Sequence, residues 1–148
     1  MNLLGPVKDI MTTQVVTVEP EATMHRVEKI FREHPFHHLP VEDQGKLIGM
    51  ISKSDFLFFK RGFNDQTTDQ RLDLFRLKVW KAKDVMVTKL AKMDPNQRID
   101  VALELFQLNL FHAIPIVEED KLLGIVTPHD VIHHIMEDRS ITNQYSSK

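Results

Sequence analysis

The sequence predicts an α+β fold made of two copies of one β-α-β-β-α unit. The chain aligns with itself at a constant offset of 75 residues without a gap, which indicates an internal duplication. Within each copy, apolar residues recur at helical spacing, and short apolar runs joined by polar turns are typical of strands. In the best-matching segments, residues 8–11 of the first copy correspond to 83–86 of the second, 36–41 to 111–116, and 46–52 to 121–127. Asp55 corresponds to Asp130.

The first copy opens with a β-leaning run over residues 15–18, which an acidic-proline pair closes. Apolar side chains three or four positions apart then predict a helix across residues 24–31. Two short strands follow, at 39–42 and 47–52, and the polar turn between them has hairpin chemistry. A second helix is expected to begin near Ser54.

The second copy repeats this order. It has a weaker β-leaning run at 89–93, a helix over 99–106, strands at 114–117 and 122–127, and a helix that begins near His129. One copy of about fifty residues would leave much apolar surface exposed. We therefore expect the two copies to pack sheet to sheet with pseudo-twofold symmetry.

A segment of residues 61–81 lies between the copies and contains a predicted amphipathic helix over 69–80. The apolar face of this helix consists of Leu72, Phe75, Val79 and Trp80. That face would either cover the core as a lid or form an oligomer contact. We divide the chain into a first repeat, residues 1–65, and a linker helix with the second repeat, residues 66–148.

The composition excludes several classes of protein. The 148 residues carry a net charge of −2 with histidine neutral, so the basic excess of a nucleic-acid or anionic-membrane binder is absent. There is no cysteine, which excludes disulfides, thiolate metal sites and cysteine catalysis. The sequence shows no signal-peptide pattern and no apolar run near the roughly 20 residues of a membrane span. We expect a cytoplasmic protein with no nucleic-acid or membrane partner.

Three short motifs occur in both copies. They are Asp-x-Met (9–11 and 84–86), x-Pro-Val or x-Pro-Ile (39–41 and 114–116), and Gly-h-h-Ser/Thr-x-x-Asp, where h is apolar (49–55 and 124–130). With these motifs in order and duplicated, the chain resembles the cystathionine-beta-synthase (CBS) domain family, whose members form pairs called Bateman modules. The resemblance covers residues 7–137. It implies a regulatory module and not an enzyme, so we assign no catalytic residue and no required cofactor.

The resemblance implies a nucleotide site at the strand-to-helix turn of each copy. A hydroxyl at the strand end and free N–H groups at the helix start can hold an anion. A carboxylate three residues on can accept both hydrogen bonds of a ribose diol, and this role falls to Asp55 and Asp130. The phosphate-facing residues are Ser52, Ser54, Thr127, His129, His37, His38 and His112. Alternatively, Ser52, Thr127 and the two aspartates only cap their helices.

By the same resemblance, each cleft combines the turn of one copy with the early strand of the other. Asp130 would then face residues 13–16, and Asp55 would face residues 88–91. The expected adenine pocket residues are Thr13, Val15, Val16, Val41, Thr88, Leu90, Ala91 and Ile116. The alternative for the valines and isoleucine is that they belong to the hydrophobic core.

The histidines set the two sites apart. His38 holds a position where nucleotide-binding members of the family often have arginine, and Ala113 departs from that pattern. A neutral imidazole is a weaker phosphate partner than arginine, and its charge changes at about pH 6.5. We hypothesise that the site near His37, His38 and Asp55 is the better phosphate binder, with an affinity that rises as pH falls. The shortage of arginine favours AMP or an adenosyl compound over ATP.

A second group of histidines lies in the last predicted helix. His129 and His133 are four residues apart and could chelate a metal on one helix face, with Asp130 and Glu137 as supplementary ligands and His134 nearby. The segment lacks the glutamate of the His-Glu-x-x-His pattern, so we assign no metal site. A metal-dependent phosphoester hydrolase at this cluster would be the enzyme alternative.

The function expected from these observations is regulatory. AMP, ADP, ATP or S-adenosylmethionine would bind in the clefts between the repeats, and the module would regulate an effector protein in trans. We also expect a homodimer. The alternative is an interaction module of the same fold that dimerises and binds partners without a nucleotide. Ala113 and the missing arginines favour that alternative, and the retained Asp55 and Asp130 disfavour it.

Overall fold

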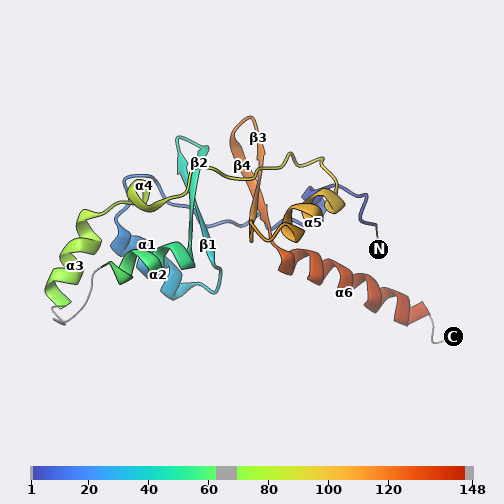
Figure 1. Cartoon of the computed structure of the whole chain (residues 1–148). Helices are drawn as coiled ribbons and strands as arrows, with labels where there is room; N and C mark the ends of the chain where they lie inside the picture. The colour runs from blue at the N-terminus through green and yellow to red at the C-terminus, as the bar shows by residue number, and fades with distance from the viewer. Residues whose placement is uncertain (1, 63–69, 146–148) are drawn as a thin grey trace. The chain divides into compact units, whose positions relative to one another are not determined.

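The computed structural model describes residues 2–62 and 70–145 (Figure 1). The chain divides into two compact units. The continuous unit is Val16–Leu90, and the discontinuous unit joins Met1–Val15 to Ala91–Lys148. Each unit combines an antiparallel hairpin with helices around a buried core, so the predicted mixed class of helices and strands is confirmed.

The continuous unit holds most of the first sequence copy. Its elements are α1 (Met24–Glu33), β1 (His38–Asp43), β2 (Lys46–Ser52), α2 (Lys53–Arg61), α3 (Gln70–Val79) and α4 (Ala82–Val85). Helix α1 begins where Thr23 caps it, because the Thr23 hydroxyl accepts a hydrogen bond from the Arg26 N–H at 3.3 Å. The turn of the hairpin has positive φ at both Gln44 and Gly45, which suits the right-handed twist of the two strands.

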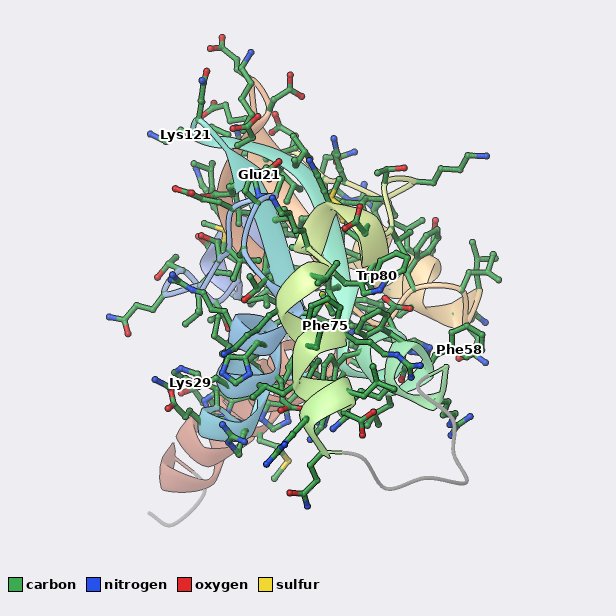
Figure 2. The ribbon with its side chains drawn as sticks, turned by 90° about the vertical axis from the view of Figure 1, so that its left-hand side faces the viewer. Glu21, Lys29, Phe58, Phe75, Trp80 and Lys121 are labelled. Atoms are coloured by element: carbon green, nitrogen blue, oxygen red, sulfur yellow. The ribbon has the colours of Figure 1, made fainter. Side chains whose placement is uncertain are left out.

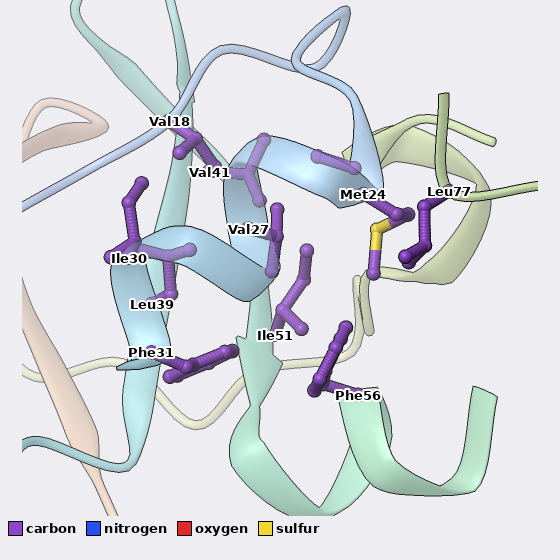
Figure 3. Packing of buried hydrophobic residues seen from close by; sticks show 11 residues of the cluster. Val18, Met24, Val27, Ile30, Phe31, Leu39, Val41, Ile51, Phe56 and Leu77 are labelled. Atoms are coloured by element: carbon purple, nitrogen blue, oxygen red, sulfur yellow. The ribbon is translucent and has the colours of Figure 1, made fainter. Parts of the chain in front are cut away.

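The core of the continuous unit lies between the hairpin and its helices (Figure 3). The apolar stripe of α1 supplies four of its side chains, as the spacing predicts. The buried residues of this core are Val18, Met24, Val27, Ile30, Phe31, Leu39, Val41, Ile51, Phe56, Leu77 and Ala82. Phe56 therefore anchors α2 against the end of β2, and this contact fixes the turn between them.

The discontinuous unit repeats this construction with the second copy. Its elements are η1 (Val7–Asp9), α5 (Ile99–Gln107), β3 (Ile114–Glu118), β4 (Lys121–Val126) and α6 (Pro128–Tyr145). Glu119 and Asp120 have positive φ, so this hairpin turns in the same way as the first. The buried core residues are Val7, Met93, Ile99, Ala102, Ile114, Ile116, Val126 and Val131.

Each unit contains the opening segment of the other sequence copy. Thr12 pairs with Ile125 through two backbone hydrogen bonds of 2.9 and 3.0 Å. Val87 pairs with Met50 in the same way, again at 2.9 and 3.0 Å. The compact units therefore do not coincide with the two sequence repeats. The boundary expected between residues 65 and 66 lies outside the described residues.

The β-leaning runs before the first helix of each copy are wrong as regular strands. Val18 forms a single parallel bridge with Val41, and Met93 forms one with Ile116. The reason is that Pro20 and Pro95 follow two residues later, and proline has no N–H to continue a ladder.

Helix α3 is confirmed, but its predicted apolar face is not the buried one. Leu77 is 5% exposed and belongs to the core, whereas Phe75 is 64% exposed. Leu72, Val79 and Trp80 are also exposed, and Figure 2 shows Phe75 and Trp80 along this helix. Spacing identified the helix but could not tell which residue meets α1. Residue 69, the expected start, lies outside the described residues.

Among the residues that the structure describes, no helix combines the length and the apolar composition that crossing a membrane requires.

Candidate functional site

The predicted ribose and phosphate residues of the continuous unit meet where β2 ends and α2 begins. The Ser52 N–H donates to Asp55 Oδ2 at 2.9 Å, and the Asp55 N–H donates to the Ser52 hydroxyl oxygen at 2.9 Å. These reciprocal bonds form a capping box, which fixes the start of the helix. Asp55 is half-exposed, and its other oxygen, Oδ1, accepts no hydrogen bond from a described residue.

The discontinuous unit places Thr127 and Asp130 in the same way. The Thr127 N–H donates to Asp130 Oδ2 at 2.7 Å, and the Thr127 hydroxyl donates to the same oxygen at 2.9 Å. The Asp130 N–H approaches the Thr127 hydroxyl oxygen at 3.4 Å. A further residue joins this turn, because the Thr12 hydroxyl donates to Asp130 Oδ1 at 3.0 Å. The capping role considered as an alternative is therefore present at both turns.

Thr12 is a residue that the sequence analysis missed. A signal for it exists at the repeat offset, where Thr12 aligns with Val87. A hydroxyl in one copy and a methyl group in the other mark a polar contact that only one unit makes. Neither residue is part of the three motifs, so the motifs do not reveal this contact.

One of the histidines expected near phosphate, His37, is tied to its turn by a backbone hydrogen bond. The Lys53 N–H donates to the His37 carbonyl at 2.8 Å, which holds His37 beside the start of α2. His112 has no such bond, because Pro128 occupies the position of Lys53 and has no N–H. Both side chains are exposed, as are those of Ser54 and His129, whereas His38 is half-buried.

The segments expected to face the adenine are divided between the two compact units. Thr88 and Leu90 belong to the same unit as Asp55, and Thr13 and Val15 belong to the same unit as Asp130. Val16 is instead the first residue of the continuous unit, and Ala91 begins the second segment of the discontinuous unit. The units by themselves therefore do not place these two beside the expected carboxylates.

Val41 and Ile116, expected as walls of the adenine pocket, are fully buried in the cores of their own units. A ligand cannot reach their side chains unless the core opens. Their placement agrees with the alternative of core residues.

The last helix brings two of the remaining histidines together. The rings of His129 and His133 stack with centroids 6.4 Å apart, and His133 Nε2 lies 3.4 Å from Glu137 Oε1. Within the described part of the chain, no group of three or more His, Cys, Asp or Glu residues could hold a metal ion.

A cavity of about 500 Å³ opens elsewhere in the continuous unit and contains none of the expected site residues. Glu19, Glu21 and Glu42 contribute to its lining, together with Arg26. Three carboxylates against one guanidinium repel phosphate, so this cavity does not suit a nucleotide.

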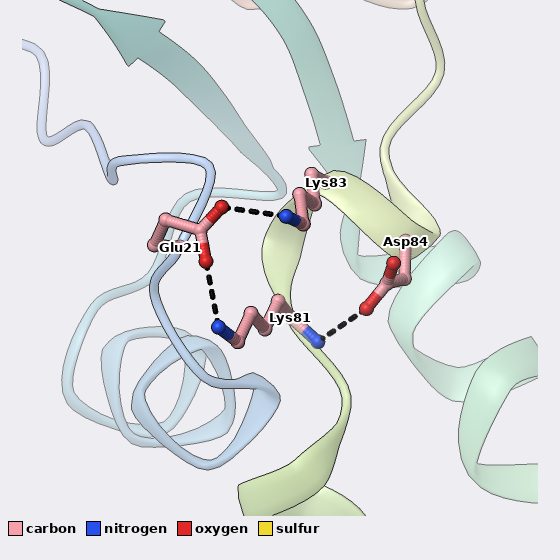
Figure 4. Close-up of polar contacts among 4 residues, drawn as sticks. All are labelled: Glu21, Lys81, Lys83 and Asp84. Atoms are coloured by element: carbon pink, nitrogen blue, oxygen red, sulfur yellow. Dashed lines mark hydrogen bonds and ion pairs between the residues drawn. The ribbon is translucent and has the colours of Figure 1, made fainter.

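Glu21 also carries the largest electrostatic perturbation of the unit (Figure 4). The Nζ atoms of Lys81 and Lys83 each lie 2.6 Å from its carboxylate. Hydrogen bonds from Lys81, which has the larger effect, and from Lys83 lower the pKa of Glu21 from 4.5 to about 2. The Lys81 N–H also donates to Asp84 at 2.9 Å, so these contacts tie α4 to the segment before α1.

Comparison with known proteins matches both copies to one family. The CBS domain model matches residues 7–62 and 82–137. The chain is 31% identical to the CBS domain-containing protein YhcV of Bacillus subtilis over 137 residues, which is 93% of this chain and 90% of that protein.

Solved structures show the same fold. The crystal structure of CBSX2 in complex with AMP matches with a TM-score of 0.76 and 22% identity, and covers 91% of this chain and 98% of that one. The CBS domain pair of protein MJ0100, in complex with 5′-methylthioadenosine and S-adenosyl-L-methionine, matches with a TM-score of 0.68 and 22% identity over 91% of this chain and 98% of that one. The CBS domain of a bacterial CNNM/CorC family Mg²⁺ transporter, in complex with ATP, matches with a TM-score of 0.70 and 24% identity. The match covers 89% of this chain and 87% of that one.

Proposed function

The chain belongs to the CBS domain family, and on that premise we propose that it is a regulatory module that binds an adenine nucleotide or adenosyl compound. AMP is the favoured ligand, and the module regulates a partner protein in trans, in the cytoplasm. Structural neighbours bound to AMP, to ATP and to S-adenosyl-L-methionine support the ligand class.

The arrangement at the start of α2 is the observation that carries this proposal. Asp55 keeps one carboxylate oxygen free of protein hydrogen bonds among the described residues, and that oxygen can accept from a ribose hydroxyl. The Ser52 hydroxyl, the exposed Lys53 and the exposed His37 surround the first turn of the helix, where phosphate is favoured. One lysine and histidines, without an arginine, suit the single phosphate of AMP better than the triphosphate of ATP.

Ligand-induced stabilisation tests the proposal. The protein is melted with millimolar AMP, ADP, ATP or S-adenosylmethionine, because a ligand at 100 times its Kd adds about 2.7 kcal/mol of stability. We expect AMP to raise the melting temperature by several degrees. Repeating the AMP measurement at pH 8 and pH 6 tests the expectation that binding at His37 and His38 strengthens as pH falls.

The matched variants for this test are Asp55→Asn and Asp130→Asn. An asparagine side-chain oxygen can still accept the capping hydrogen bond, so the helix start is preserved while the carboxylate is lost. Loss of the AMP shift in either variant supports ribose binding by that residue. The absence of any shift with all four ligands would contradict nucleotide sensing.

Exposed apolar side chains favour a second candidate, the interaction module without a nucleotide. Leu57 and Phe58 on α2, and Ile132 and Met136 on α6, are 48%, 75%, 57% and 55% exposed. These helices are the ones that we expect to form a homodimer. Light scattering of the wild type and of a Phe58→Glu variant tests this, since a dimer through α2 would dissociate in the variant.

A further inference from the structure

The two ribose carboxylates differ in how much of their hydrogen-bonding capacity the protein already uses. A carboxylate has about four lone-pair positions. Among the described residues, Asp55 accepts one hydrogen bond, from the Ser52 N–H. Asp130 accepts three, from the Thr127 N–H, the Thr127 hydroxyl and the Thr12 hydroxyl.

A ribose diol donates two hydrogen bonds, so it needs two free acceptor positions. Asp55 offers both on Oδ1, which no described residue contacts. Asp130 has both of its oxygens engaged, Oδ2 by Thr127 and Oδ1 by Thr12. A nucleotide at Asp130 would have to displace the Thr12 hydroxyl, and a displaced bond offsets much of what the new one contributes.

The hydroxyl that precedes each carboxylate shows the same difference. The Ser52 hydroxyl accepts from the Asp55 N–H and donates to no described residue, so its proton is available to a phosphate oxygen. The Thr127 hydroxyl already donates to Asp130. Both groups that a nucleotide would contact are therefore available in the continuous unit and engaged in the discontinuous unit.

One substitution between the repeats accounts for the difference at Oδ1. Thr12 and Val87 occupy equivalent positions, and each pairs its backbone with the second hairpin strand of its unit. Only Thr12 carries a hydroxyl, and its partner Asp130 lies 118 residues further along the chain. Val87 is nearly isosteric with threonine and leaves its carboxylate unoccupied.

We propose that this chain binds one nucleotide, at the Asp55 turn, and that the Thr12 hydroxyl keeps the Asp130 turn closed to ribose. The inference rests on the proposed function, because it takes the two turns as the nucleotide sites. It assigns Thr12 and Val87 as the residues that determine which of the two turns is used.

Isothermal titration of the full chain with AMP tests this, using two reciprocal variants. Thr12→Val removes the hydroxyl from Asp130, and Val87→Thr adds one where Asp55 can receive it. We expect one AMP per wild-type chain and a second site in Thr12→Val. In Val87→Thr we expect affinity to fall roughly tenfold, the effect of about one hydrogen bond.

Two further variants serve as controls. Thr12→Ser keeps the hydroxyl and should retain one site. Thr17→Val removes a hydroxyl that contacts Glu42 and neither of the two aspartates, and it should also leave the stoichiometry unchanged. Melting curves without ligand check that each variant is folded, which the nearly isosteric threonine–valine exchanges favour.

The outcomes separate the two proposals. The inference is overturned if the wild type binds AMP at two equal sites. It is also overturned if the wild type binds at one site and this binding survives Asp55→Asn. Both outcomes leave nucleotide sensing intact. A Thr12→Val variant with unchanged stoichiometry overturns it as well. No binding of AMP, adenosine or S-adenosylmethionine to any variant overturns the proposed function and this inference with it.

Discussion

Met86 covers Gly49 so closely that a β-carbon at residue 49 would lie 2.5 Å from the Met86 sulfur. Met11 covers Gly124 in the same way, where a β-carbon would lie 2.8 Å from the sulfur and 2.7 Å from the Thr12 carbonyl oxygen. Each methionine comes from one sequence copy and each glycine from the other. The Asp-x-Met and Gly-h-h motifs are therefore the two sides of one contact.

Alanine at either glycine should destabilise the protein, because the added methyl group has no space. We expect Gly49→Ala and Gly124→Ala each to lower the free energy of unfolding by about 1–3 kcal/mol, the range for overpacking. Urea denaturation measures this loss. The loss should be larger at Gly124, where a backbone carbonyl cannot move away as a flexible methionine can.

Shortening the methionine that covers each glycine should rescue the two alanine variants to different extents. Met86→Ala removes the sulfur and Cγ, the two atoms closest to a β-carbon at residue 49, so the effect of Gly49→Ala should shrink in that background. Met11→Ala should rescue Gly124→Ala only in part, since the Thr12 carbonyl remains. Equal rescue at both positions would contradict this explanation.

Leu77 attaches α3 to the core of the continuous unit, whereas Phe75 on the same helix is exposed. We expect Leu77→Ala to lower the free energy of unfolding by about 2–4 kcal/mol, as for other buried leucines. Phe75→Ala, on the same helix, should change it by less than about 0.5 kcal/mol. Chemical denaturation of the two variants at low protein concentration, which excludes self-association, compares them.

The ion pairs of Glu21 predict a stability difference that depends on pH. The pKa of this carboxyl is lowered to about 2 in the folded chain, so its contribution is present above its ordinary value of 4.5 and is lost as pH falls toward 2. Glu21→Gln should lower the melting temperature by no more than a few degrees near neutral pH, because the pairs are solvent-exposed.

The difference between the wild type and Glu21→Gln should narrow between pH 4.5 and pH 2, and also at high salt. Glu19→Gln is the control, since Glu19 forms no ion pair with a described residue. A difference that stayed constant down to pH 2 would show that the ion pairs are not its cause.

Fragments should fold according to the compact units and not according to the sequence repeats. We expect residues 16–90 to form a cooperatively melting structure, because Met86, Val87 and the hairpin that they contact are all included. Residues 1–65 lack Met86 and leave Gly49 uncovered. Circular dichroism melts of the two fragments compare them, and a better-folded 1–65 would contradict the division.

Much of the fold could be predicted from the sequence, since helical spacing and hairpin turns are local signals. The helices from Met24 and Ile99 and both hairpins were predicted and are confirmed. Val18 and Met93 each form a single bridge, to Val41 and to Ile116, and β-propensity misled here because the prolines two residues later, which are visible in the sequence, stop the ladder. The buried side of α3 depends on the tertiary partner of Leu77, which spacing alone does not identify.

At the candidate site, the sequence analysis named helix capping as the alternative role of the two turns, and the structure shows these capping bonds. The motifs identified Ser52 with Asp55 and Thr127 with Asp130, and the structure pairs them. The contact of Thr12 with Asp130 joins opposite ends of the chain, and no local pattern reveals such a pair. Ribose and phosphate binding at these residues remains a prediction.

Because each unit contains the opening segment of the other sequence copy, the two units can fold in a definite order during translation. Once residue 90 has left the exit tunnel, every segment of the continuous unit is available to fold. Residues 1–15 must wait for partners that are translated much later, since Thr12 reaches Asp130 across 118 residues. Asp55 therefore belongs to the unit whose segments are all synthesised first, and the Thr12–Asp130 contact forms only after residue 130 has been made.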